Sequence, residues 1–269
     1  AVIKGRGIRS LEEYLKVLRT GRGTRFDPSR RRQAWDYMKE WDAGMAQRDT
    51  LDFADTITRA VEHAQGFTGP WYRAAVIDEA QDLTLMGLQL VRALVNGKRD
   101  DDRDDGLLIV GDGAQRIYPG AFTLRQAGVE VRGRTTVLRL NYRNTAEILA
   151  AATTVLGNGP VVDMDDEDSD APNRFEEERA EASRSGLRPL LVDCGDDERE
   201  NVFLVKQIKN VVASGVVGYG DIGVFVPINS MVKATVKRLN EGGVSAVPLK
   251  QYDGIPSPEV KVGTYARSK

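Results

Sequence analysis

The pattern of apolar and polar residues divides the chain into a helical start and two regions in which strands alternate with helices. Residues 1–72 have helical spacing, with a short amphipathic stretch over residues 11–18 and another helix over residues 51–64. Between these two, Asp27 followed by Pro28 is typical of an N-cap with proline at the first helical position. We therefore predict three helices in this segment.

Two details of these helices depend on individual side chains. The third helix has two candidate N-caps, Thr50 and Asp52. The middle helix carries Trp35, Met38 and Trp41 at three-residue spacing, which places them on one face. Such a stripe could stack nucleic-acid bases, but packing against another helix is its more frequent use. We predict a packed stripe.

From residue 73 onward, short apolar runs alternate with amphipathic helices, as expected of a parallel sheet. In the first region the predicted strands are residues 74–77, 107–110 and 137–140, and the predicted helices are residues 85–94 and a helix from about Thr145. In the second region the predicted strands are residues 189–192, 222–226 and 260–263, and the predicted helices are residues 198–214 and 230–239. We predict an α/β fold whose sheets are covered on both faces.

Four polar residues stand just past the ends of predicted strands: Asp78, Glu79, Asp112 and Arg143. Ligands of parallel α/β sheets bind at these strand ends. An apolar strand that delivers two adjacent carboxylates can place a magnesium ligand beside a base that orients water. Magnesium takes one or two carboxylates and fills its other positions with water and phosphate oxygens. Asp78 and Glu79 are therefore candidates for a metal ligand and a catalytic base.

Composition narrows the chemistry. The chain has 269 residues, 41% of them hydrophobic and 29% charged, which is an ordinary globular mixture. No apolar stretch approaches the length of a membrane span, and residues 1–20 lack the apolar centre of a signal peptide, so we expect a cytoplasmic protein without a membrane partner. The single cysteine, Cys194, excludes an internal disulfide framework, and the single histidine, His63, argues against a catalytic triad or multi-histidine metal centre.

Charge is unevenly distributed, although the net charge is only −2. Residues 1–72 include the basic run Arg30, Arg31 and Arg32, whereas residues 163–181 contain ten acidic residues and two arginines. The basic part could contact nucleic acid, or it could be solvated helix faces. Because residues 157–188 are mostly polar and contain few apolar residues, we predict a linker or mobile loop there.

The predicted boundaries follow from these breaks in composition. The four predicted parts are a helical segment over residues 1–72, an α/β domain over 73–156, the acidic linker over 157–188 and a second α/β domain over 189–269.

Several segments, in order, resemble motifs of the UvrD/Rep family of superfamily 1 helicases. Residues 78–82 (DEAQD) resemble motif II, residues 110–118 (VGDGAQRIY) motif III, residues 140–144 (LNYRN) motif IV and residues 260–269 (VKVGTYARSK) the start of motif V. Residues 51–55 (LDFAD) resemble the segment before motif II, and residues 221–226 (DIGVFV) a strand of the second motor domain. The match spans about residues 50–269, and its order and spacing make it specific.

The resemblance implies a fold and a function. The fold is parts of two RecA-like parallel-sheet domains, 1A and 2A, preceded by a 1B-like helical segment. The function is that of a fragment of an ATP-dependent translocase or helicase, a P-loop NTPase of DNA repair, acting on single-stranded DNA rather than RNA, with ATP and Mg²⁺. The alternative is a nucleic-acid-binding or regulatory module that hydrolyses nothing.

On the nucleotide side, the resemblance assigns a role to each matching residue. Asp78 would hold Mg²⁺, and Glu79 would orient and deprotonate the attacking water. Gln115 would contact the γ-phosphate, and Arg143 would be the arginine finger that neutralises charge during transfer. Tyr142 would stack on the adenine, or it could be a core aromatic residue, as Arg143 could be a helix cap.

Asp112 would complete the nucleotide-binding set beside motif III. On the nucleic-acid side, Tyr118 would stack a base and Thr264 would bind a phosphate. Tyr118 could also be a core aromatic residue. Pro119 and Gly120 stand where relatives have arginine and a stacking tryptophan, so Phe122 is the nearest aromatic residue that could substitute.

The sequence also departs from the family pattern. It contains no Walker A motif (G-x-x-x-x-G-K-[ST]), no motif VI, and Ala266 where many relatives have histidine. Only a short connection precedes motif V, so the large 2B insertion is missing or reduced to a loop. We therefore expect an excised piece of a longer helicase that is inactive alone and is marginally stable, rearranged or covered by a second copy.

Overall fold

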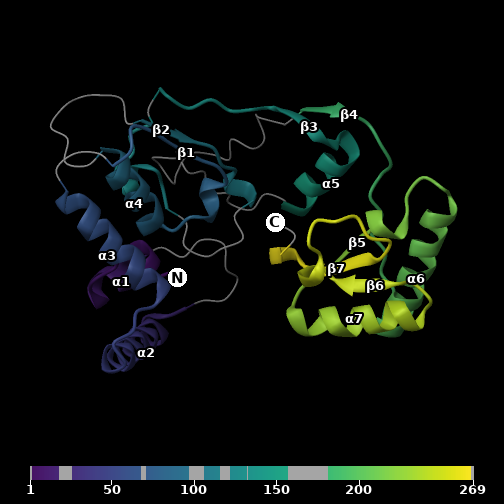
Figure 1. The fold of residues 1–269 in the computed structure, drawn as a ribbon, viewed down its shortest axis with the longest axis horizontal. Coiled ribbons are helices and arrows are strands. Elements are labelled where there is room, and N and C mark those ends of the chain that lie inside the picture. The colour runs from purple at the N-terminus through teal and green to yellow at the C-terminus, as the bar shows by residue number, and fades with distance from the viewer. Residues whose placement is uncertain are drawn as a thin grey trace. The chain divides into compact units, whose positions relative to one another are not determined.

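The computed structural model describes residues 2–17, 26–67, 71–96, 106–115, 122–131, 133–156 and 181–267. The chain divides into two compact units, Ala1–Arg188 and Pro189–Lys269, each of which is described by itself (Figure 1). Both units contain parallel strands and helices, so the predicted α/β fold class is confirmed. Within the described ranges, no helix is long and apolar enough to cross a membrane.

Three α-helices follow a short 3₁₀ turn at Lys4–Arg6: α1 Leu11–Lys16, α2 Pro28–Gln47 and α3 Phe53–Gly66. Each α-helix begins at a side-chain N-cap. Ser10, Asp27 and Asp52 accept hydrogen bonds from the backbone N–H groups three residues further on. The cap of α3 is therefore Asp52, and Asp55 completes a capping box with it.

The packing of α1 on α2 combines an aromatic pair with an arginine cap. The rings of Tyr14 and Trp35 stack with their centroids 6.2 Å apart, and Trp35 is buried. Arg31 Nη1 donates to three backbone carbonyl groups at the end of α1, at 2.8–3.0 Å. Trp41 is 58% exposed. The packed-stripe prediction is therefore right for Trp35 and wrong for Trp41, because α1 is too short to cover both.

In one sheet of the first unit, the described residues form two parallel strands, β1 Ala75–Ile77 and β2 Leu107–Ile109. Helix α4, Leu85–Asn96, contributes to the core on one of its faces. Short 3₁₀ turns follow the strands at Ala80–Asp82 and Gly113–Gln115, and another lies at Arg125–Ala127.

The two faces of this sheet differ in burial. Ile77 belongs to the buried apolar cluster that includes Leu88 and Phe122. On the opposite face, Val76 is 72% exposed and Leu108 is 58% exposed. The prediction that both faces of the sheet are covered is therefore wrong for the described part of this sheet, because no described element packs over Val76 and Leu108.

A second parallel pair in the first unit joins β3, Leu140–Thr145, to β4, Glu181–Arg184, beside helix α5, Ala146–Leu156. The predicted strand over residues 137–140 overlaps β3 only at Leu140. β4 lies inside the predicted linker. Its sequence, EASR, contains no apolar run from which a strand could be predicted. The strand forms through backbone pairing, in which the N–H of Glu181 donates to Arg139 O at 2.9 Å.

The second unit is a three-stranded parallel sheet in the order β5-β7-β6, flanked by two helices (Figure 1). Its strands are β5 Gly223–Val226, β6 Ala246–Pro248 and β7 Val260–Thr264, and its helices are α6 Asp197–Ala213 and α7 Asn229–Glu241. Further 3₁₀ turns lie at Tyr219–Asp221, Leu249–Gln251 and Tyr265–Arg267. All five residues of β7 are buried, as befits the central strand.

Two predictions for the second unit change. Residues 189–192 form no strand, and Leu190 and Leu191 are 83% and 101% exposed, because nothing described pairs with this segment. β6 was not predicted, since three residues give too little pattern. Residues 249–259 alone connect β6 to β7, which agrees with the predicted loop in place of a large insertion.

Candidate functional site

The two predicted carboxylates lie where β1 leaves its sheet. The backbone N–H of Val110 donates to Ile77 O at 2.8 Å, and the N–H of Ala80 donates to Val110 O at 3.0 Å. Between these two bonds, Asp78 and Glu79 leave the strand with exposed side chains. Asp78 Oδ1 accepts the N–H of Glu79 at 2.9 Å. The carboxylate pair is therefore at the carboxyl end of a parallel strand, as predicted.

Glu79 has a left-handed backbone, with φ of 52°. Only a few per cent of non-glycine residues adopt this conformation, and it persists where surrounding contacts impose it. Here it turns the chain from β1 into the 3₁₀ turn Ala80–Asp82. Glu79 consequently stays exposed while Gln81, two residues further on, is buried.

Gln81 joins the end of β1 to the end of β2. Its Nε2 donates a short hydrogen bond to Glu79 Oε2, and its Oε1 accepts the backbone N–H of Asp112 at 3.0 Å. The side chain is only 2% exposed. A buried amide is stable only when its polar atoms are hydrogen-bonded, and both ends of this one are.

Motif III continues the same network. Gln115 Nε2 donates to Asp112 Oδ2 at 2.8 Å, and the Gln115 N–H donates to Asp112 O at 3.1 Å. The structure therefore brings Glu79, Asp112 and Gln115 together through Gln81. From the sequence, no role was assigned to Gln81, although it stands in the quoted motif. The available signal was a polar residue two positions after Glu79.

Gly111 leaves the space that Gln81 fills. A Cβ atom at position 111 would lie 2.8 Å from Gln81 Oε1 and 3.4 Å from the Cβ of Ala80. Real Cβ atoms essentially never approach within 3.0 Å of another heavy atom. A side chain at position 111 would therefore displace the Gln81 amide, so glycine serves close approach here rather than an unusual backbone angle.

Two residues predicted on the nucleic-acid side have different outcomes. Tyr118 lies outside the described residues. Phe122 is 2% exposed and belongs to the core cluster with Ile77 and Leu88. Phe122 as a base-stacking residue is thus corrected: its ring packs under the sheet, where no base can reach it.

Motif IV is an exposed part of the β3–β4 sheet. Tyr142 is 70% exposed and Arg143 is also exposed. The Asn141 side chain shapes this segment, since its Oδ1 accepts the N–H groups of Arg143 and Asn144 at 2.9 and 2.8 Å. Exposure makes both candidate side chains accessible, but no described hydrogen bond joins Arg143 to the Glu79 network.

Thr264 ends β7 in the second unit and is 8% exposed, next to Tyr265, which is 59% exposed. The same strand carries a buried lysine. Lys261 Nζ donates to Gly220 O at 3.0 Å and to Ser257 O at 2.8 Å. It also lies 5.1 Å from the centroid of the Tyr252 ring. Lys261 therefore anchors the β6–β7 connection instead of facing a ligand.

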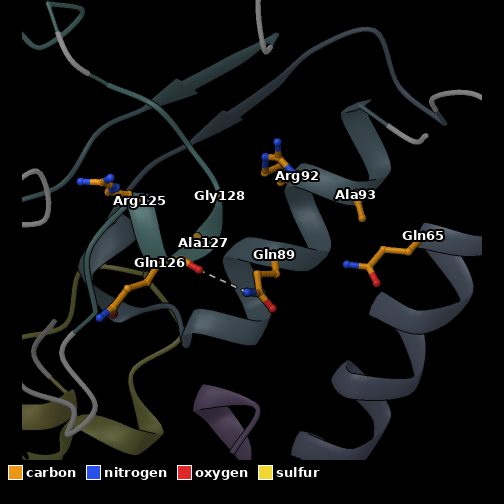
Figure 2. A pocket seen from close by; sticks show the side chains of 8 residues that line it. All are labelled: Gln65, Gln89, Arg92, Ala93, Arg125, Gln126, Ala127 and Gly128. Carbon is orange, nitrogen blue, oxygen red and sulfur yellow. Dashed lines mark hydrogen bonds between the residues drawn. The ribbon is translucent and has the colours of Figure 1, made fainter. Parts of the chain in front are cut away.

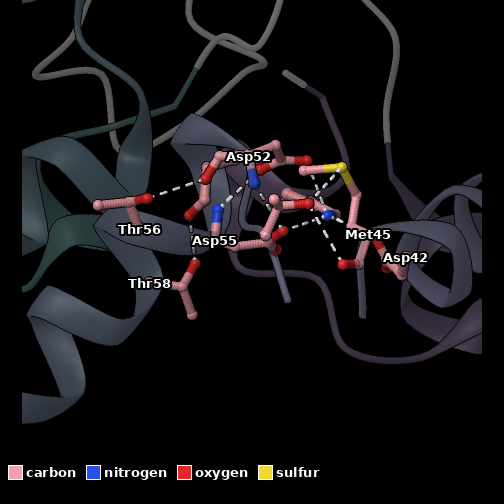
Figure 3. A network of polar contacts seen from close by, with 9 residues as sticks. Asp42, Met45, Asp52, Asp55, Thr56 and Thr58 are labelled. Atoms are coloured by element: carbon pink, nitrogen blue, oxygen red, sulfur yellow. Dashed lines mark hydrogen bonds and ion pairs between the residues drawn. The ribbon is translucent and has the colours of Figure 1, made fainter. Parts of the chain in front are cut away.

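Three carboxylates, those of Asp42, Asp52 and Asp55, also converge (Figure 3). Lys4 Nζ lies among them as a shared ion-pair partner, 2.8 Å from the oxygens of Asp52 and Asp55. No other group of three possible metal ligands lies this close in the described ranges. Because a cation of the chain already occupies its centre, this cluster is a structural ion-pair network.

The charges of this cluster shift its proton affinities. Burial acts to lower the pKa of Lys4, but hydrogen bonds to the three carboxylates outweigh it and raise that pKa above its ordinary value. Burial acts to raise the pKa of Asp52, but the hydrogen bonds from Lys4 and from the Asp55 backbone bring it down to about 2.

A shallow pocket lies elsewhere on the first unit, between α3, α4 and the turn Arg125–Ala127 (Figure 2). Its polar lining includes Arg92 and Arg125, and Gln89 Nε2 donates to Gln126 O at 3.4 Å across it. It shares no residue with the predicted site.

The comparisons with known proteins point to the same helicase family as the motifs do. Residues 9–129 match the model of the UvrD/REP helicase N-terminal domain. The ATP-dependent DNA helicase UvrD1 of Mycobacterium bovis is 29% identical over 231 residues, which cover 80% of this chain and 28% of that protein. UvrD1 of Mycobacterium leprae is 28% identical over 214 residues, which cover 72% of this chain and 25% of that protein. The chain thus spans about a quarter of the length of these relatives.

Proposed function

We propose that the chain supplies part of an ATP-hydrolysing motor that moves on single-stranded DNA, as its match to the UvrD/REP helicase N-terminal domain model over residues 9–129 and its similarity to UvrD1 helicases suggest. The observation that carries this proposal is the network at the ends of β1 and β2. It joins Glu79 of motif II to Gln115 of motif III through Gln81 and Asp112. Such a connection suits a site in which a catalytic base and a phosphate contact act together.

The donor set at these strand ends fits magnesium. Asp78 and Asp112 are exposed carboxylates, and Mg²⁺ prefers hard oxygen ligands. In the proposal Asp78 holds the ion and Asp112 lies on the nucleotide side. Bound there, Mg²⁺ would neutralise charge on the phosphates of the substrate, ATP.

The remaining roles belong to side chains of this chain. Glu79 orients a water molecule and accepts its proton as the water oxygen attacks the γ-phosphorus and the bond to ADP breaks. Gln115 contacts the γ-phosphate. Arg143 acts as the arginine finger, a group worth several orders of magnitude in rate where it operates. Tyr142, with its exposed ring, stacks on the adenine.

Two separate DNA contacts are proposed, Tyr118 in the first unit and Thr264 at the end of β7 in the second unit. Thr264 is mostly buried, so its contact with a phosphate requires that phosphate to approach the strand end closely. The neighbouring Tyr265 offers the exposed surface there.

Single-turnover and steady-state ATPase assays of the full-length gene product, with and without single-stranded DNA, test this proposal. We expect DNA-stimulated hydrolysis that Glu79→Gln abolishes while nucleotide binding persists. The matched control is Glu40→Gln, which changes an exposed carboxylate of α2. Undiminished turnover in Glu79→Gln would contradict the assignment of Glu79 as the catalytic base.

A second candidate function is a nucleic-acid-binding module without ATPase activity, favoured by the lack of a G-x-x-x-x-G-K-[ST] motif in these 269 residues. It predicts that the full-length product binds oligonucleotides with an affinity that ATP does not change. DNA-stimulated hydrolysis would exclude it.

A further inference from the structure

The orientation of the Gln81 amide is determined by its two neighbours. A backbone N–H can only donate a hydrogen bond, so the atom of Gln81 that faces Asp112 N must be the oxygen, Oε1. The NH₂ group then faces Glu79, whose Oε2 accepts its hydrogen bond. The assignment of oxygen and nitrogen therefore follows from chemistry and is not an arbitrary choice.

The burial of Gln81 makes this bridge rigid. The side chain is 2% exposed and fills the space above Gly111, where even a methyl group would lie too close. A glutamine on a surface samples many rotamers, whereas this one has both ends bonded and no room to turn. A movement of the Asp112 backbone is therefore transmitted to the Glu79 carboxylate.

We propose that Gln81 is a positioning residue that sets the Glu79 carboxylate against motif III, so that the base is aligned when Gln115 engages the terminal phosphate of a nucleoside triphosphate. The inference rests on the proposed function, because it gives Glu79 and Gln115 their roles. Gln81 itself is too deeply buried to touch substrate. It acts through Glu79 on one side and through Asp112, which accepts a hydrogen bond from Gln115, on the other.

The first arm of the test uses kinetics of the full-length gene product. Gln81→Met keeps the length of the side chain and removes both hydrogen bonds. We expect kcat to fall about 10- to 100-fold, because a misplacement of about 1 Å at a catalytic group can cost about 100-fold, with the KM for ATP changed less than about threefold. An unchanged kcat, or a loss that appears only in KM, would overturn the proposal.

A double-mutant cycle separates positioning from general destabilisation. Glu79→Asp shortens the carboxylate by one methylene, so it no longer reaches Gln81. If Gln81 acts through Glu79, adding Gln81→Met to Glu79→Asp costs less than about twofold more in kcat. If the fold-losses in kcat of the two single variants multiply in the double variant, the proposal that Gln81 acts through Glu79 is contradicted. Thermal unfolding of each variant accompanies the kinetics.

The second arm does not depend on ATPase activity, so it distinguishes failure of this inference from failure of the proposed function. In ¹H–¹⁵N spectra of the 269-residue chain, Glu79→Gln should shift the side-chain NH₂ signals of Gln81 and the backbone signal of Asp112. Glu40→Gln should shift neither. If Glu79→Gln leaves both signals in place, the link between motif II and motif III is refuted whatever the enzyme does.

Discussion

The side-chain oxygen of Gln81 lies so close to Gly111 that a Cβ atom there would be 2.8 Å from it. Gln81 follows β1 and Gly111 follows β2, and each limits what the other can be. The Gln81 amide occupies the space that a side chain at position 111 would need. Because glycine leaves that space free, Gln81 can accept the N–H of Asp112.

Gly111→Ala is therefore expected to displace the Gln81 amide and weaken both of its hydrogen bonds. Leaving buried polar groups unsatisfied costs about 1–3 kcal/mol, so the free energy of unfolding of the first unit should fall by that order. Urea titration followed by circular dichroism measures it. Gly44→Ala is the matched control, since an added Cβ on that α2 glycine meets nothing within 4 Å and should be neutral or stabilising.

The Lys4 cluster predicts a large effect from one substitution. Lys4→Met removes the cation shared by Asp42, Asp52 and Asp55, and leaves three carboxylates facing one another. Removing one partner of a largely buried ion-pair network costs about 3–5 kcal/mol, reduced here because the carboxylates are partly exposed. We expect a loss of about 2 kcal/mol. Arg9→Met, which breaks an exposed pair with Glu62, should cost under about 1 kcal/mol.

Acid should weaken the same region in a defined window. The pKa of Asp52 is about 2 in the folded protein, below its ordinary value of 3.8. A depressed pKa contributes stability that is present above about pH 4 and is lost as the pH falls toward 2. Equilibrium unfolding at pH 5, 4, 3 and 2 should show a decline that is shallower in Asp52→Asn, which keeps the helix cap but cannot titrate. Equal slopes for the two proteins would contradict the assignment.

Lys261→Met tests the anchor of the β6–β7 connection. The substitution keeps an apolar stem in the core of the second unit but leaves the Gly220 and Ser257 carbonyl oxygens without their lysine donor. We expect a loss of about 1–3 kcal/mol and faster hydrogen exchange at residues 252–257. Lys250→Met, on the exposed turn after β6, is the control and should change exchange little.

The sequence predicts those parts of the fold that have local causes. Asp27 and Asp52 begin helices because a carboxylate at that position satisfies a backbone donor within four residues. Asp78 and Glu79 follow β1 because an apolar run ended by polar residues is typical of a strand that ends at a surface. None of these inferences needs to know what lies across the molecule.

What could not be predicted depends on partners distant in the chain. β4 is polar, yet it forms because Arg139 and Asn141 of another segment pair with it. Residues 189–192 are apolar, yet no described strand pairs with them. No role was predicted for Gln81, which stands between Ala80 and Asp82. Its burial follows from the left-handed turn at Glu79, which a sequence pattern does not reveal.

That turn also limits how position 79 can change. The residues most at ease with a positive φ are glycine and asparagine, and neither carries a carboxylate. Aspartate has the charge and tolerates the backbone, but it is one methylene too short to reach the Gln81 amide. Glutamate is thus the residue that meets the requirement for charge and the requirement for reach while bearing the conformational strain. A saturation library at this codon should accordingly contain few functional members, even though the side chain is open to solvent.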